Sequence, residues 1–156
     1  MKSPVMAQSI VEEALSWVGT PFAHQQAAKG VAVDCANFIR QVSEATGATP
    51  DVDFERNYRK REDGTQMLLE LVRYMEPVRR LDDAGSVTLA YALPADVLAL
   101  HDGEDFSKPR HLAFLTRLDP YPKMCHASER GVVHHRIDAH FRGLIHSIWK
   151  RPGLTY

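Results

Sequence analysis

The hydrophobic pattern of the chain changes its period at Pro77, and this change constrains the fold most. Before Pro77, apolar residues recur every three or four positions, which is typical of one face of a helix. After Pro77, short apolar runs alternate with Pro, Gly and Asp clusters at hairpin-like spacings. The pattern predicts helices over 4–18, 34–46 and 67–75, and strands over 77–81, 96–100, 111–118, 123–127, 132–137 and 144–150. Helices followed by a strand meander indicate an α+β fold, with the N-terminal helices packed on a C-terminal antiparallel sheet of about five or six strands.

Composition narrows the class of protein. The chain has 156 residues, which fits a single domain over 1–156. A formal net charge of −1 gives no electrostatic case for nucleic acid or a membrane surface as partner. Two cysteines do not make a disulfide framework. The first residues lack the apolar core of a signal peptide and no run has membrane-spanning length, so we expect a product that is cytoplasmic as made, without membrane insertion.

One cysteine stands where a helix is expected to begin. Asp34 is a good N-cap, because its carboxylate can accept hydrogen bonds from free N–H groups of the first turn. Cys35 then lies at the helix N-terminus, where the macrodipole favours thiolate over thiol. The sequence therefore makes Cys35 a candidate nucleophile. The alternative is that Cys35 is a small buried apolar residue, as most free cysteines are.

Two histidines are candidates for the base that a catalytic thiol needs. His111 opens an apolar strand, and the turn at 118–122 sends the chain back through His126. In a hairpin centred between residues 118 and 119, His111 and His126 are direct cross-strand neighbours, and His126 can hold the His111 ring. Cys125 then points to the opposite face and is expected to pack in the core. For either histidine alone, the alternative is a polar residue at a strand end.

The remaining histidines do not predict a metal site. His134, His135 and His140 lie close together in sequence, but no Cys or carboxylate shares a recognisable ligand spacing with them. We therefore predict neither a metal nor a cofactor.

Several segments together resemble one known family. Residues 17–22 and 30–35 resemble the nucleophile region of the NlpC-type, papain-like cell-wall peptidases. Residues 94–98, 111–113 and 125–128 are similar to the family's later motifs, in the same order. The segment from Phe22 to Gln25 is more similar to the phage-encoded branch than to the secreted bacterial members. The similarity covers roughly residues 10–150.

The resemblance implies a fold, a reaction and roles for three residues. It implies a papain-like α+β fold and hydrolysis of γ-D-glutamyl to diamino-acid bonds in peptidoglycan stem peptides. Carried over by position, Cys35 is the nucleophile, His111 the base and His126 the residue that orients the base, with acyl transfer through a thioester. The expected partner is a stem peptide or muropeptide. Phage tail proteins are further candidate partners, with the virion as a candidate location.

The resemblance also assigns substrate-binding positions and exposes departures. In the family, an acid at the position of Asp34 sits beside the amino end of the substrate, although capping is the simpler role here. Phe22 stands where a tyrosine is usual, so a hydroxyl is missing, and His24 or Gln25 is a candidate replacement donor. Ala36-Asn37 stands where Ser-Gly is usual, so the packing behind the thiol differs. Ala95 stands where a glycine is common before the aspartate.

These departures leave two alternatives open. The chain is either a cysteine peptidase of the cell wall, or a non-catalytic module for phage tail assembly or peptidoglycan binding that retains the fold. A third reading keeps the three residues and changes the acyl substrate to another amide, a thioester or a toxin target.

Overall fold

The computed structural model describes residues 4–48, 64–78 and 87–156. Four α-helices lie within these ranges: α1 (Ala7–Ser16), α2 (Cys35–Ala45), α3 (Thr65–Tyr74) and α4 (Ala139–Gly143). The strands are β1 (Val5–Met6), β2 (Ala27–Ala28), β3 (Ala32–Val33), β4 (Glu76–Pro77), β5 (Val97–Leu100), β6 (His111–Arg117), β7 (Lys123–Ser128), β8 (Gly131–Arg136), β9 (Ile145–Lys150) and β10 (Leu154–Thr155). A short 3₁₀ helix covers Leu89–Tyr91.

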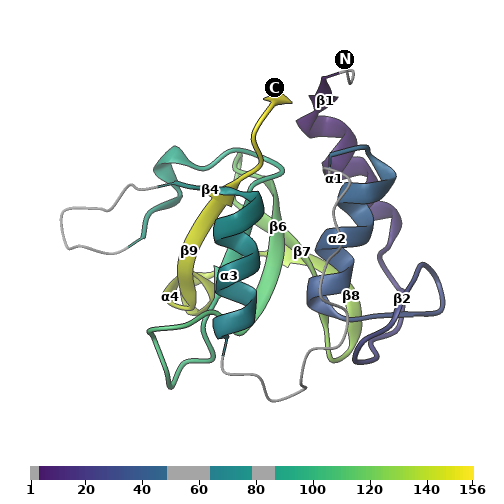
Figure 1. Cartoon of the computed structure of the whole chain (residues 1–156). Coiled ribbons are helices and arrows are strands. Elements are labelled where there is room, and N and C mark those ends of the chain that lie inside the picture. The colour runs from purple at the N-terminus through teal and green to yellow at the C-terminus, as the bar shows by residue number, and fades with distance from the viewer. Residues whose placement is uncertain (1–3, 49–63, 79–86) are drawn as a thin grey trace.

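One antiparallel sheet organises the molecule. Its six strands lie in the order β4-β9-β5-β6-β7-β8, and every neighbouring pair is antiparallel. Helices α1, α2 and α3 pack on one face of this sheet, and the two termini meet through the parallel β1–β10 pair (Figure 1). The predicted α+β class, with N-terminal helices on a C-terminal antiparallel sheet, is confirmed.

The main core lies between these helices and the sheet. Phe38 of α2 has no exposed surface, and its ring makes edge contacts with Trp17 at 5.9 Å and with Phe114 of β6 at 5.6 Å between centroids. These contacts join α1, α2 and the sheet at one point. They also hold the N-terminus of α2 beside the first residues of β6, where the candidate site lies.

The opposite face of the sheet carries a second, smaller core. Leu98, Leu115 and Met124 point to this face and are fully buried under α4 and its neighbouring segments. Apolar side chains therefore point to both faces from the central strands, which explains why β5 reads as an unbroken apolar run rather than an alternating one.

The predicted helices and strands are present in the structure, which also contains elements that were not predicted. The helix α4 was not predicted, because it has only five residues and begins after the capping Asp138. The predicted strand 77–81 appears as β4, and its remainder from residue 79 lies outside the described residues. Each other predicted element begins and ends within a few residues of its prediction. The two-residue strands β1, β2, β3 and β10 and the 3₁₀ helix were not predicted.

The predicted register of the β6–β7 hairpin is wrong by two residues. Phe114 pairs with Cys125 and Leu115 with Met124, after which a bulge shifts the register before Arg117 pairs with Lys123. His111 and His126 are therefore diagonal rather than direct neighbours. Because a shift of two residues preserves the face, both side chains still lie on the same side of the sheet.

The Phe38 contacts predict a large loss of stability on truncation. Phe38→Ala is expected to lower the free energy of unfolding by about 3–5 kcal/mol, because it removes a buried ring and leaves a cavity. Urea denaturation measures this change. The matched control is Phe106→Ala, because Phe106 is 67% exposed and its truncation is expected to change stability little. Equal effects of the two substitutions would contradict the central role of Phe38.

Candidate active site

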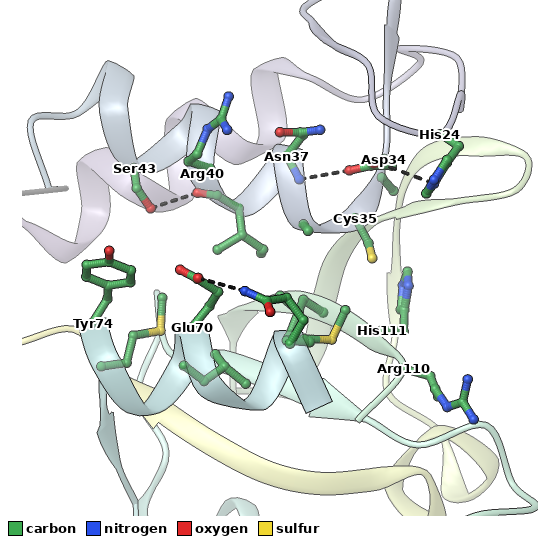
Figure 2. A pocket seen from close by; sticks show the side chains of 18 of the residues that line it. His24, Asp34, Cys35, Asn37, Arg40, Ser43, Glu70, Tyr74, Arg110 and His111 are labelled. Atoms are coloured by element: carbon green, nitrogen blue, oxygen red, sulfur yellow. Dashed lines mark hydrogen bonds and ion pairs between the residues drawn. The ribbon is translucent and has the colours of Figure 1, made fainter. Parts of the chain in front are cut away.

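A cavity of about 380 Å³ lies between α2, α3 and the start of β6. Cys35 and His111 stand at one end of it, and Figure 2 shows the Cys35 sulfur pointing toward the His111 ring. Helix α3 forms the wall opposite α2. Its first turn is fixed against the loop before His111 by Gly64, whose φ is +89° and where an added Cβ would overlap the Pro109 carbonyl oxygen.

The helix that carries Cys35 begins as the sequence predicts. One Asp34 oxygen accepts a hydrogen bond from the Asn37 backbone N–H at 2.9 Å, which is the capping interaction. The other accepts from the Gln25 backbone N–H at 2.6 Å. Asp34 is 3% exposed, so one buried carboxylate ties the helix start to the preceding loop. Its second bond places the loop that carries His24 over the cavity mouth.

The Cys35 thiol is protonated in the resting site. Desolvation raises its pKa from 9.0 to about 11, although the backbone amides of Leu112, Ala36 and Cys35 itself favour the thiolate. The expectation that the helix N-terminus lowers this pKa is therefore wrong in net effect, because burial outweighs the helix dipole. The Leu112 amide also shows how close the sulfur lies to the start of β6. The described residues include no hydrogen bond between Cys35 and His111.

Three histidines from three adjacent strands form a hydrogen-bonded chain. His111 Nε2 lies 2.7 Å from His126 Nδ1, and His126 Nε2 lies 2.7 Å from His135 Nε2. His135 Nδ1 in turn lies 2.7 Å from the backbone carbonyl oxygen of Arg136. His126 is 5% exposed, so the middle of the chain is shielded from water. The predicted contact of His111 with His126 is thus present, and His135 extends it.

The carbonyl at the end of this chain fixes the tautomer of every ring. A carbonyl oxygen only accepts, so His135 carries its proton on Nδ1. With His135 neutral, its Nε2 accepts from His126 Nε2–H, and His126 Nδ1 accepts from His111 Nε2–H. His111 is left with an unprotonated Nδ1. A free ring nitrogen is what a general base needs.

Burial keeps the first two rings neutral. Desolvation lowers the pKa of His111 from 6.5 to about 4. It lowers the pKa of His126 from 6.5 to about 3, with added repulsion from His111 and His135. The resting site is therefore a neutral thiol beside a neutral imidazole. A thiolate–imidazolium pair forms only when something stabilises the two charges together.

The structure brings together most of the predicted substrate-binding residues. Phe22, His24, Asp34 and Ala36 line the cavity with Cys35, and the His24 ring lies 4.0 Å from Asp34 Oδ2. Gln25 is not among the residues that line it, and its backbone N–H donates to Asp34. Its role as a substrate contact stays a prediction.

Cys125 has the structural role that strand alternation predicted. It is fully buried in the main core, and its Sγ donates to the Ala14 carbonyl oxygen at 3.6 Å. Burial raises the pKa of its thiol to about 12. The described residues therefore contain one thiol at the cavity and one in the core.

Sequence reasoning missed two parts of the site. His135 was considered only as a metal ligand. The signal that could have found it was the alternation of side chains in the β7–β8 hairpin, which puts His135 on the same face as His126. The cavity wall supplied by α3 and by Arg151 gave no sequence signal at all. Among the described residues, no group of three or more His, Cys, Asp or Glu side chains is arranged to hold a metal ion. None of the described helices is long and apolar enough to cross a bilayer.

Comparisons of sequence found no match, whereas comparisons of structure found proteins that share the fold of this chain. No protein-family model matches the sequence, and no curated protein matches it. The fold is similar to a lipoprotein-like protein of the NLP/P60 family from Staphylococcus aureus, with a TM-score of 0.62 and 14% identity over 100% of this chain. It is similar to an NlpC/P60 family protein from Bacillus cereus, with a TM-score of 0.63 and 14% identity over 96% of this chain.

A third solved structure matches at single-domain length. The NlpC/p60 domain of the peptidoglycan hydrolase SagA has a TM-score of 0.52 and 20% identity, and the match covers 85% of this chain and 91% of that domain. The chain spans 45% and 41% of the Staphylococcus and Bacillus proteins. The chain therefore has the NlpC/P60 papain-like fold that the resemblance implied. The phage-encoded branch stays a prediction.

The neutral histidines predict a specific loss of stability in acid. The pKa of His126 is about 3 in the folded chain and 6.5 for the free side chain. Between these two pH values, the unfolded chain therefore binds a proton at His126 and the folded chain does not. Its contribution to stability is complete above pH 6.5 and falls as the pH drops below that value. His126→Gln is expected to reduce the loss of unfolding free energy between about pH 7.5 and about pH 5 by about 2 kcal/mol.

Urea denaturation at the two pH values measures this difference. The control is His140→Gln, which removes an exposed histidine from α4. An unchanged pH dependence in His126→Gln would show that His126 is not held neutral by the fold.

Proposed function

We propose that the chain is a cysteine peptidase that hydrolyses γ-D-glutamyl to diamino-acid amide bonds in peptidoglycan stem peptides. One observation carries this proposal: a histidine chain with a fixed direction ends in a free Nδ1 beside the only thiol that lines the described cavity. A structural role does not require that a buried imidazole be both neutral and oriented toward a cavity sulfur. The NlpC/P60 fold supports the substrate class, because one protein that shares it is a peptidoglycan hydrolase.

The reaction begins from the neutral pair. His111 Nδ1 takes the thiol proton as the Cys35 sulfur attacks the carbonyl carbon of the scissile amide. The tetrahedral intermediate collapses when His111 returns that proton to the leaving amine, which leaves a thioester on Cys35. Water then attacks the thioester, giving its proton to His111, and the release of a carboxylate restores the thiol. His126 and His135 orient the base and stabilise its cationic form.

The backbone at the start of α2 supports the charged intermediates. The N–H groups of Cys35 and Ala36 point toward the sulfur and favour its thiolate. We propose that the Cys35 N–H also donates to the oxyanion, since the first amides of a helix have no partner within it. Phe22 and His24 line the same mouth, so they are candidates for contact with the peptide around the scissile bond.

A second candidate is the non-catalytic module. The observation that favours it is the high pKa of Cys35, about 11, together with the Phe22 and Ala36 departures. The two candidates differ in whether Cys35 is needed for turnover. A different acyl substrate at the same three residues is a variant of the first candidate, and assays on purified muropeptides separate it from the proposed one.

Removal of the nucleophile is the direct test of turnover. Cys35→Ser is expected to lower cleavage of purified muropeptides to the background rate, because a hydroxyl has a far higher pKa than a thiol and the site lowers neither. Chromatography of the products measures the rate, and circular dichroism confirms that the fold survives. The matched control, Cys125→Ala, alters the core thiol and is expected to retain turnover. Full activity in Cys35→Ser would refute the proposal.

The role of His135 has its own test. His135→Phe keeps a ring beside Phe141, which lies 4.7 Å away between centroids, but removes the acceptor of the His126 proton. The tautomer of His126 is then no longer fixed, and we expect kcat to fall by about tenfold or more with little change in KM. His135→Gln supplies an amide oxygen near the same place and is expected to restore much of the rate. Equal rates in the Phe and Gln variants would contradict the orienting role.

A further inference from the structure

Arg151 is a buried cation in the wall of the cavity that contains Cys35. It is 8% exposed and follows the last residue of β9. The pairing of Glu76 with Lys150 places it opposite Met75, at the point where α3 ends. Neither the histidine chain nor the nucleophile uses it.

The charge of Arg151 has no partner among the described residues. The other two cavity arginines do: Arg40 lies 3.4 Å from Glu44, and Arg110 lies 3.9 Å from Asp102. The neighbouring Lys150 points elsewhere and contacts Asp96 at 3.0 Å. Desolvation alone lowers the pKa of Arg151 from 12.5 to about 10, with no compensating charge. A buried unpaired guanidinium is costly, so an anion that enters the cavity would meet a cation already stripped of water.

The thiol and Arg151 lie at opposite ends of the cavity. Cys35 begins α2, and the far end is marked by Ser43, eight residues or roughly 12 Å along the helix axis. Tyr74 lies across from Ser43 at that end, as Figure 2 shows. Because Arg151 is opposite Met75, it belongs to the Tyr74 end rather than the Cys35 end.

The walls between the two ends of the cavity are mostly apolar and suit an aliphatic chain. Ile39 of α2 and Met67 and Leu71 of α3 line this middle section. The polar exception is Glu70: its Oε1 accepts from Gln66 at 3.1 Å, whereas its Oε2 is buried without a hydrogen-bond partner. An apolar passage with an unpaired acceptor and an unpaired cation fits a chain of methylene groups that ends in an ammonium and a carboxylate.

We propose that Arg151 binds a carboxylate of the stem peptide that is remote from the bond to be cleaved. The inference rests on the proposed function, because it takes the stem peptide as substrate. The α-carboxylate of the D-glutamyl residue lies only roughly 5 Å from the scissile carbonyl when extended, which is too near. The distal carboxylate of a diamino-dicarboxylic acid such as diaminopimelate reaches roughly 9 Å through an aliphatic chain. The Arg151 side chain spans the remaining distance between this carboxylate and the far end of the cavity. A lysine in that position has the ammonium and lacks the carboxylate.

The test measures peptide binding in a chain that cannot cleave. Calorimetry compares Cys35→Ala with Cys35→Ala/Arg151→Gln on L-Ala-γ-D-Glu-meso-diaminopimelate, on the same peptide with the side-chain carboxylate amidated, and on the L-Lys peptide. We expect the loss of Arg151 to weaken the first peptide by about tenfold or more and to leave the other two within about twofold. A fourth peptide, amidated only at its main-chain carboxyl terminus, tests the other carboxylate of the diamino acid, which lies only roughly 4 Å from the scissile carbonyl carbon. Arg151→Gln is expected to weaken this peptide as much as the first. Loss of the Arg151 effect in this peptide would overturn the assignment of Arg151 to the distal carboxylate.

Two further outcomes would overturn the proposal: an equal weakening of all four peptides by Arg151→Gln, or no weakening of any. Arg73→Gln on the exposed side of α3 removes the same charge and is expected to bind like the parent. Hydrolysis by the unsubstituted chain is scored separately. Arg151-dependent binding without hydrolysis refutes only the peptidase, and hydrolysis without Arg151-dependent binding refutes only the anchor.

Stability separates a binding arginine from a structural one. Arg151→Met removes an unpaired buried charge and keeps the aliphatic stem, so we expect its melting temperature to equal or exceed that of the parent. A fall of several degrees would show that Arg151 supports the fold, and the anchor role would then be rejected.

Discussion

The carbonyl oxygen of Arg136 can only accept a hydrogen bond, and this one constraint orients three imidazole rings. His135 must donate to it, and each ring in turn must accept on one side and donate on the other until His111 is left with a free Nδ1. The direction of the chain is therefore set by backbone at the end farthest from the thiol. The sheet makes this possible, because β6, β7 and β8 are adjacent and antiparallel, so their side chains on one face lie in a continuous row.

Burial governs the electrostatics of the same region. It raises the pKa of Cys35 and lowers those of His111 and His126, so the site rests without charge. A neutral pair costs little to bury. In the proposed reaction, the thiolate and imidazolium form only when a bound substrate excludes water and supplies a polarised carbonyl. Arg151 is the opposite case: it cannot lose its charge near neutral pH, and it lies in the wall without a charged partner in the part of the chain that the structure describes. The cavity therefore has the neutral Cys35–His111 pair at one end and the permanently charged Arg151 at the other.

The departures from the family pattern affect different parts of the structure. Ala95 stands where the family commonly has glycine, and its φ of +80° lies in the left-handed region that glycine tolerates best. That departure concerns backbone strain away from the cavity. Phe22 and Ala36 line the cavity itself, so they alter its surface. Neither residue contributes to the histidine chain, which is built entirely from the sheet.

The sequence by itself determined the main helices and strands of this protein and the position of Cys35 at a helix start. The period change at Pro77 predicted the α+β class, and Asp34 predicted the start of the helix with Cys35 in its first turn, because helix caps and hydrophobic periods are local properties of the chain. It also placed His111 and His126 on one face, although the observed register of the β6–β7 hairpin differs from the predicted one by two residues. Only the tertiary structure decided the pKa of Cys35, the entry of His135 into the chain and the burial of Arg151. Each of these depends on which distant segments exclude water from a given atom, and no local pattern in the sequence records that.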